Sequence, residues 1–187
     1  MPDNTTDNKV VDAMDKEDYA DAKAHLEELK DQVLKALSAA VDNAMECQAN
    51  APTKKPFPDD DPRNPESDDE GYYDLVGKIP GCCEAWNQAE HQFHIAIQKI
   101  RDCSEDWDKE KMTKDQKDLK DAANDCIKEW NEAKKSDRGR KTLTNSLKSV
   151  IKEAGRSGDG TASADAISEQ LKWLLEEDSS SDEEMLE

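Results

Sequence analysis

The sequence has few apolar residues. Hydrophobic residues make up 34% of the 187, and aromatic residues make up 5%. No apolar run approaches the roughly 20 residues that a membrane-spanning helix needs, which excludes a transmembrane segment. The first residues have neither a basic flank nor an apolar stretch, so we expect no secretory signal. These absences predict an intracellular protein, cytoplasmic or nuclear, or a virion component.

The residues that usually carry chemistry are also scarce. There are three histidines, and none follows a glutamate by three positions, which excludes the Glu-x-x-His pattern of di-iron bundles. His91 and His94 lie one helical turn apart, but we expect His91 on the solvent side, opposite Phe93. The sequence contains no glycine-rich phosphate loop and no nucleophile elbow. We therefore predict a non-enzymatic protein without a metal or another cofactor.

Five cysteines are present, an odd number. On one continuous helix Cys82 and Cys103 would lie roughly 30 Å apart, far beyond the reach of a disulfide. A helical hairpin folded near residue 110 also separates Cys103 from Cys126. Cys47 with Cys82 or Cys83 remains geometrically open, and we otherwise expect free, buried thiols in a reducing compartment.

A short pattern recurs three times, placing a cysteine four residues before a tryptophan at 82–86, 103–107 and 126–130. Residues four apart share one face of a helix, so each copy sets a small polarisable side chain beside a large one. Positions 82, 86, 89, 93, 96, 100, 103 and 107 then form a heptad seam of alternating large and small residues. We interpret the repeat as core packing.

Three further patterns predict helices. From Tyr19 to Ala44, apolar residues recur in steps of three and four, which indicates a long amphipathic helix. Thr113 and Gln116 form a capping box that opens a helix with an apolar stripe from Leu119 to Ala133. A connection of about five residues makes this helix an antiparallel neighbour of the preceding one.

Residues 49–80 contain a proline cluster followed by acidic residues. From Asp59 to Asp74 there are eight acids and one arginine, so we interpret the segment as an acidic, Pro-rich linker. Its apolar residues either tuck the linker onto the helices or form a docking motif. The candidate docking residues are Tyr72, Tyr73 and Leu75.

The charge reverses between residues 134 and 156, which hold eight bases and two acids. We expect this basic helix to face the acidic linker or tail of the same chain, or a partner's acidic surface. Beyond it we predict a short fifth helix that leaves Trp173 off its apolar stripe, then an acidic tail. The remaining candidate partner-binding residues are Arg138, Arg140, Lys141, Lys148, Lys152, Trp173, Met185 and Leu186. Ser179, Ser180 and Ser181 each precede an acid by three positions and are candidate phosphosites.

The predicted fold is all-α: an antiparallel helical bundle of three to four long helices with an acidic linker, a short detachable fifth helix and an acidic tail. The expected segments are an acidic amino-terminal arm (1–16), the first helix (17–48), the linker (49–80), a helical hairpin plus the basic helix (81–155), and a flexible joint with the short helix and tail (156–187). The leading interpretation is a non-enzymatic protein–protein interaction or assembly protein, and the sequence leaves its oligomeric state open. The net charge of −19 leaves a second interpretation, an acidic nucleic-acid mimic or chaperone that blocks a partner's basic surface, and argues against direct nucleic-acid binding.

Overall fold

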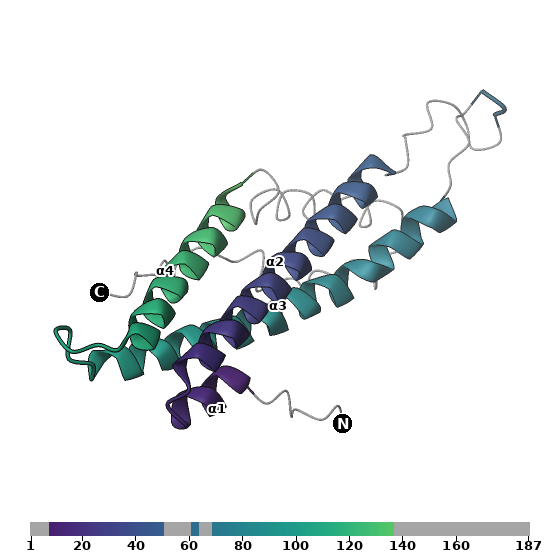
Figure 1. Ribbon diagram of the computed structural model, residues 1–187. Coiled ribbons are helices and arrows are strands. Elements are labelled where there is room, and N and C mark those ends of the chain that lie inside the picture. Colours follow the sequence, from purple (N-terminus) through teal and green to yellow (C-terminus); the bar gives the residue numbers. More distant parts are fainter. Residues whose placement is uncertain (1–7, 51–60, 64–68, 137–187) are drawn as a thin grey trace. The chain divides into compact units, whose positions relative to one another are not determined.

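The computed structural model describes residues 8–50, 61–63 and 69–136. Over these residues the fold is all-α, as the sequence predicts, with four helices and no strand. The helices are α1 (Lys9–Asp15), α2 (Tyr19–Ala49), α3 (Asp69–Glu105) and α4 (Lys114–Lys135) (Figure 1). Within this part of the chain, no helix is long and apolar enough to span a bilayer.

The described residues belong to two compact units. The first unit contains residues 8–36 and 85–135, and the second contains residues 37–50, 61–63, 69–84 and 136. Each of the long helices α2 and α3 is continuous and contributes one segment to each unit. Lys134 and Lys135 form the last turn of α4. The predicted basic helix after residue 139, the fifth helix and the acidic tail lie outside the described residues.

Helix α1 corrects the prediction that residues 1–16 form only an acidic arm. Its apolar side chains Val10, Ala13 and Met14 are buried. Their spacing of three and four residues puts them on one helical face, so even a seven-residue helix can bury an apolar stripe. The acidic composition of the segment predicts an arm, but the burial of this short apolar stripe favours a helix.

A tight backbone motif ends α1. The amide of Asp18 donates to the carbonyl of Ala13 at 2.8 Å, and the amide of Glu17 donates to Met14 at 3.0 Å. This is the hydrogen-bond pattern of a Schellman motif, which requires a left-handed residue after the helix. Glu17 occupies that position with φ of 57°, where glycine is usually preferred.

Helix α2 begins directly after this turn, because Asp18 also caps it. One carboxylate oxygen of Asp18 accepts from the amide of Asp21 at 3.2 Å, which satisfies a donor of the first turn. The predicted apolar stripe is confirmed in its main part, since the following residues are buried: Ala22, Leu26, Val33, Leu37, Ala40, Val41 and Ala44. Met45 differs from the prediction and is 46% exposed.

Helix α3 begins at Asp69, well before the predicted end of the linker at residue 80. The segment contains Pro80, and prolines and glycines inside a helix argue against helix formation. However, Ile79 is buried and lies seven residues before the buried Trp86, so this segment extends the apolar face of the helix that follows. Tertiary burial therefore outweighs the local preference against helix.

The seam predicted along α3 is confirmed at its centre, where Trp86, Phe93, Ala96 and Ile100 are buried. It is wrong for the cysteines at either end. Cys82 and Cys103 are only half-buried, whereas Cys83, which was expected off the seam, is buried. The reason is that a straight helix has 3.6 residues per turn, so a strict seven-residue pattern drifts around its surface over a long helix.

The capping box predicted for α4 is confirmed by two reciprocal hydrogen bonds. The amide of Thr113 donates to Oε1 of Gln116 at 2.9 Å, and the amide of Gln116 donates to Oγ1 of Thr113 at 3.2 Å. Leu119, Cys126 and Trp130 are buried on one face of the helix, as the apolar stripe predicts. Ala123 and Ile127 widen this stripe.

Ion pairs join the helices of the first unit. Lys30 of α2 forms an ion pair with Glu129 of α4 at 2.8 Å, and these helices run beside each other in Figure 1. Lys99 of α3 pairs with Asp15 at the end of α1 at 2.9 Å. The hydrogen bond from Lys30 to Glu129 is the main cause that raises the pKa of Lys30.

The second unit brings the end of α2 against the start of α3. Nδ2 of Asn43 donates to the backbone carbonyl of Leu75 at 3.4 Å. Cys47 and Ile79 of the same unit are buried. Between the two helices, Arg63 binds Asp61 through its side chain at 2.6 Å. This local ion pair is exposed and closes a turn within the proline-containing segment.

Candidate functional site

The structure describes three of the residues that the sequence suggested for partner binding. Tyr72 and Tyr73 lie in the first two turns of α3, and Leu75 follows them as a half-buried residue. These residues are therefore part of a helix, whereas the docking motif was predicted within a linker. The other candidates lie outside the described residues: Arg138, Arg140, Lys141, Lys148, Lys152, Trp173, Met185, Leu186 and the candidate phosphosites Ser179, Ser180 and Ser181.

An aromatic cluster occupies the core of the first unit. The ring of Trp130 lies edge-on to Trp86 with 6.4 Å between centroids, and edge-on to Phe93 with 6.5 Å between centroids. All three side chains are almost completely buried. Edge-to-face geometry places the positive edge of one ring on the negative face of another, which adds to the apolar burial. Two of the three Cys-x-x-x-Trp tryptophans therefore serve as core residues.

The third tryptophan of the repeat packs differently. Trp107 follows the end of α3 and is half-buried, with its ring edge-on to Tyr19 at 5.2 Å between centroids. Tyr19 is the first residue of α2. This contact fixes the start of α2 against the end of α3 within the first unit.

The buried thiols are in environments that favour their protonated form. Burial raises the pKa of Cys83 to about 12 and the pKa values of Cys47 and Cys126 to about 11. The thiolate is the reactive nucleophile and metal ligand, so these three cysteines are poorly reactive at neutral pH. All five cysteines are free thiols, including Cys47, for which a disulfide had remained open.

The histidines of α3 lie on its outer surface. His91 and His94 are both exposed, as predicted for His91. His94 pairs with Glu90 at 3.7 Å. Within the described residues, no group of three or more histidine, cysteine or acidic side chains is arranged to hold a metal ion.

A first cavity lies between α3 and α4 in the first unit. Its volume is about 110 Å³, and it is lined by Phe93, His94, Ile97, Gln98, Arg101, Ile127 and Trp130. The buried residues among these give it apolar walls. The indole Nε1 of Trp130 is buried and has no hydrogen-bond partner among the described residues.

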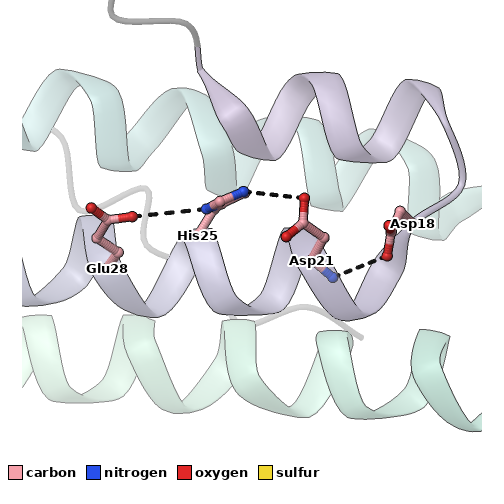
Figure 2. Close-up of polar contacts among 4 residues, drawn as sticks. All are labelled: Asp18, Asp21, His25 and Glu28. Carbon is pink, nitrogen blue, oxygen red and sulfur yellow. Dashed lines mark hydrogen bonds and ion pairs between the residues drawn. The ribbon is translucent and has the colours of Figure 1, made fainter.

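His25 on α2 lies between two acidic side chains on the same helix (Figure 2). Its Nε2 is 3.2 Å from Oδ2 of Asp21, and its Nδ1 is 3.8 Å from Oε2 of Glu28. The spacings of four and three residues bring all three side chains to one face of α2. Both carboxylates are more than half exposed, whereas the imidazole is largely covered. The acidic neighbours therefore fix the orientation of the imidazole ring.

A second cavity, lined mostly by polar residue types, lies beside this histidine. Its volume is about 140 Å³, and it is lined by Asn8, Lys9, His25, Glu28, Leu29, Gln32 and Gln92. These residues come from the start of α1, from α2 and from α3, all within the first unit. Both side-chain polar atoms of Asn8 are buried, and neither has a hydrogen-bond partner among the described residues. Gln32 donates to Glu28 at 3.5 Å.

Sequence reasoning did not identify this second cavity. The sequence places Asn8 in the predicted amino-terminal arm and tests His25 only against a di-iron pattern. The acids four residues before and three residues after His25 were a local signal for its environment. Nothing in the sequence indicated that Gln92, on a helix far along the chain, would line the same cavity.

Neither a family model, nor a curated protein, nor a solved structure matches this chain. Its function has to be inferred from its own residues.

Proposed function

We propose that the chain is a non-enzymatic, acidic protein–protein interaction or assembly protein built on an antiparallel helical bundle. Its aromatic and sulfur-containing side chains stabilise the helical body, and partner binding uses the surface and the segments that extend from it. The candidate binding segments are the acidic linker, the basic fourth helix and the carboxy-terminal arm with Trp173, Met185 and Leu186.

The observation that carries this proposal is that most of the described cysteines and tryptophans are buried in the helical core. Trp86 and Trp130 are buried against each other, and the buried thiols hold their protons at neutral pH. A nucleophilic cysteine needs a partly exposed, electropositive setting that lowers its pKa, and burial acts in the opposite direction here. The same residues are well suited to a rigid core that presents a charged surface.

The test is affinity capture with the full chain, comparing wild type with Trp173→Ala and with a chain that lacks residues 164–187. Lys172→Ala serves as the neighbouring control. We expect the wild type and the control to retain a common set of partners at raised salt, and the other two variants to lose it, since apolar anchors are little affected by screening. Identical capture by all four chains would refute the assignment of the carboxy-terminal arm.

A second candidate function is an acidic mimic or chaperone that occupies a basic, nucleic-acid-binding surface. It is favoured by four exposed acids on the first part of α2, namely Asp21, Glu27, Glu28 and Asp31. Neither Glu27 nor Asp31 contacts His25, and Asp31 forms an ion pair with Lys30 at 3.3 Å. Closely spaced carboxylates raise the local negative potential, which attracts basic surfaces and is screened by salt.

The acidic-mimic function is tested with a matched pair of double variants. Glu27→Gln with Asp31→Asn removes two negative charges from α2, and Lys117→Gln with Lys128→Gln removes two exposed positive charges from α4. A mimic predicts weaker capture of basic partners by the first variant, equal or stronger capture by the second, and steep loss with salt for both. Capture that does not depend on salt would exclude this candidate.

A further inference from the structure

Helix α1 is short, yet its apolar face is completely packed. Val10, Ala13 and Met14 are 0%, 3% and 4% exposed, respectively. The helix has seven residues, whereas an isolated helix is only marginally stable in water below about 12–15 residues. Burial of this face in the first unit therefore holds α1 in its helical form.

The contacts of α1 are made with the bodies of α2 and α3. Asn8 at its start lines the second cavity together with His25 of α2 and Gln92 of α3. Asp15 at its end pairs with Lys99 of α3 at 2.9 Å. Figure 1 shows α1 folded back beside the first turns of α2. The buried face and the ion pair both lie outside residues 16–18, which connect α1 to α2. The α1 of a second copy can therefore make the same contacts.

The connection between α1 and α2 is strained. We call residues 16–18 the hinge. Glu17, in the middle of the hinge, has a φ of 57°, and it is the one non-glycine residue in the described part of the chain with a positive φ. This left-handed conformation brings the Cβ of an L-residue too close to the following carbonyl oxygen. The strain is present only while the hinge folds α1 back onto its own unit.

The same three hinge residues are compatible with an open, helical connection. They are Lys16, Glu17 and Asp18, and none is a glycine or a proline. If they adopt helical dihedrals, α1 and α2 merge into one helix over residues 9–49. Opening releases the strain at Glu17, and it separates the apolar face of α1 from the surface that this face covers.

We propose that two copies of this chain exchange α1 by opening the hinge, so that α1 of each copy packs on α2 and α3 of the other. The exchange buries the same apolar face and forms the same ion pair, now between copies. It also removes the strain at both hinges, and short strained hinges favour this kind of exchange. The opposing cost is the freedom that two chains lose when they associate. This association goes beyond the proposed function and does not depend on its partner-binding segments.

The first test measures the mass of the full chain by size-exclusion chromatography with light scattering, after refolding from urea at increasing protein concentration. A short connection gives an intramolecular contact an effective concentration in the millimolar range, so we expect a dimer with a dissociation constant on the order of 1 mM or lower. Glu17→Gly removes the strain from both closed hinges and should raise this constant at least about ten-fold. Glu17→Val adds strain, because β-branched residues are disfavoured at positive φ, and should lower it about three-fold. A monomer at every concentration, or equal constants for wild type and Glu17→Gly, overturns the proposal.

A charge reversal across the ion pair distinguishes exchange from a dimer in which each α1 stays in its own copy. Asp15→Lys and Lys99→Asp are made in separate chains, and each places like charges together in the closed monomer and in a homodimer. A mixture of the two chains restores both ion pairs only in a heterodimer that has exchanged α1. One chain is isotopically labelled, and the refolded mixture is weighed by native mass spectrometry at low salt.

We expect the heterodimer to exceed its statistical share at least about ten-fold, because charges at contact distance act with little screening at low salt. The control mixes wild type with a chain that carries both substitutions. Its exchanged heterodimer places like charges together at both sites, so it should fall below the statistical share. Statistical shares in both mixtures mean that α1 stays in its own copy, and they overturn the proposal. If Glu17→Val does not fold, Glu17→Gly and the two mixtures still decide it.

Discussion

Replacing Trp86 by alanine tests whether the aromatic cluster is the core of the first unit. Trp86 is fully buried and lies edge-on to Trp130. A large aromatic residue buries about 150–250 Å², which at about 25 cal/mol per Å² corresponds to roughly 4–6 kcal/mol for the whole side chain. Measured large-to-alanine changes at such positions cost about 3–5 kcal/mol. We therefore expect Trp86→Ala to lower the free energy of unfolding by about 4 kcal/mol.

The assay is urea denaturation followed by far-ultraviolet circular dichroism, which does not depend on the tryptophan that is removed. In a thermal melt followed by the same signal, the melting temperature should fall by about 8–16 °C, given about 2–4 °C per kcal/mol for a chain of this size. Ile95→Ala on the same helix is the control, because Ile95 is 37% exposed and should cost about 1 kcal/mol or less. A loss for Trp86→Ala no larger than that of the control would refute the core assignment.

A double-mutant cycle separates the ring contact from simple burial. Trp86→Ala and Trp130→Ala should be non-additive, because each removes the edge-to-face contact seen at 6.4 Å between centroids. We expect a coupling energy of about 0.5–1.5 kcal/mol. Strict additivity of the two losses would mean that the two rings do not stabilise one another.

Three further predictions concern local stability. Glu17→Gly should stabilise the chain by about 1 kcal/mol in thermal denaturation, because Glu17 holds a left-handed conformation that glycine adopts without strain. Gly77→Ala and Gly81→Ala should each stabilise α3 by up to about 1 kcal/mol, because a Cβ at either position meets open space and alanine is the better helix former; a loss of helicity would contradict this. Burial raises the pKa of Cys83 from 9.0 to about 12, so its contribution to stability is complete below pH 9 and is lost as the pH rises toward 12. The free energy of unfolding should fall over this interval by about 1.4 kcal/mol per pH unit for each such thiol, and Cys83→Val should reduce that slope.

The helical class and the main apolar faces could be predicted because they depend on short-range periodicity. The stripe through Leu26 and Val33, the capping box at Thr113 and the burial of Trp130 all follow from spacings of three and four residues. The apolar signals persist in the structure because the residues that carry them are buried.

The errors came from places where local preference and tertiary packing disagree. The proline cluster and the acids of residues 49–80 predict a linker, yet the burial of Ile79 keeps the end of this segment within α3. The acidic residues near the start of the chain concealed the buried face of α1 around Val10. The second cavity could not be predicted at all, because it combines Asn8 with Gln92, and their proximity is set by packing between helices.

The salt dependence of partner capture by the full chain tests the proposed function most directly. Captured proteins are identified by mass spectrometry from low to high salt for wild type, for the chain lacking residues 164–187 and for Glu27→Gln with Asp31→Asn. An interaction protein that binds through its carboxy-terminal arm predicts partners that wild type and the double variant retain at high salt and that the truncated chain loses. Partners retained equally by all three chains, or captured by none of them, would contradict it.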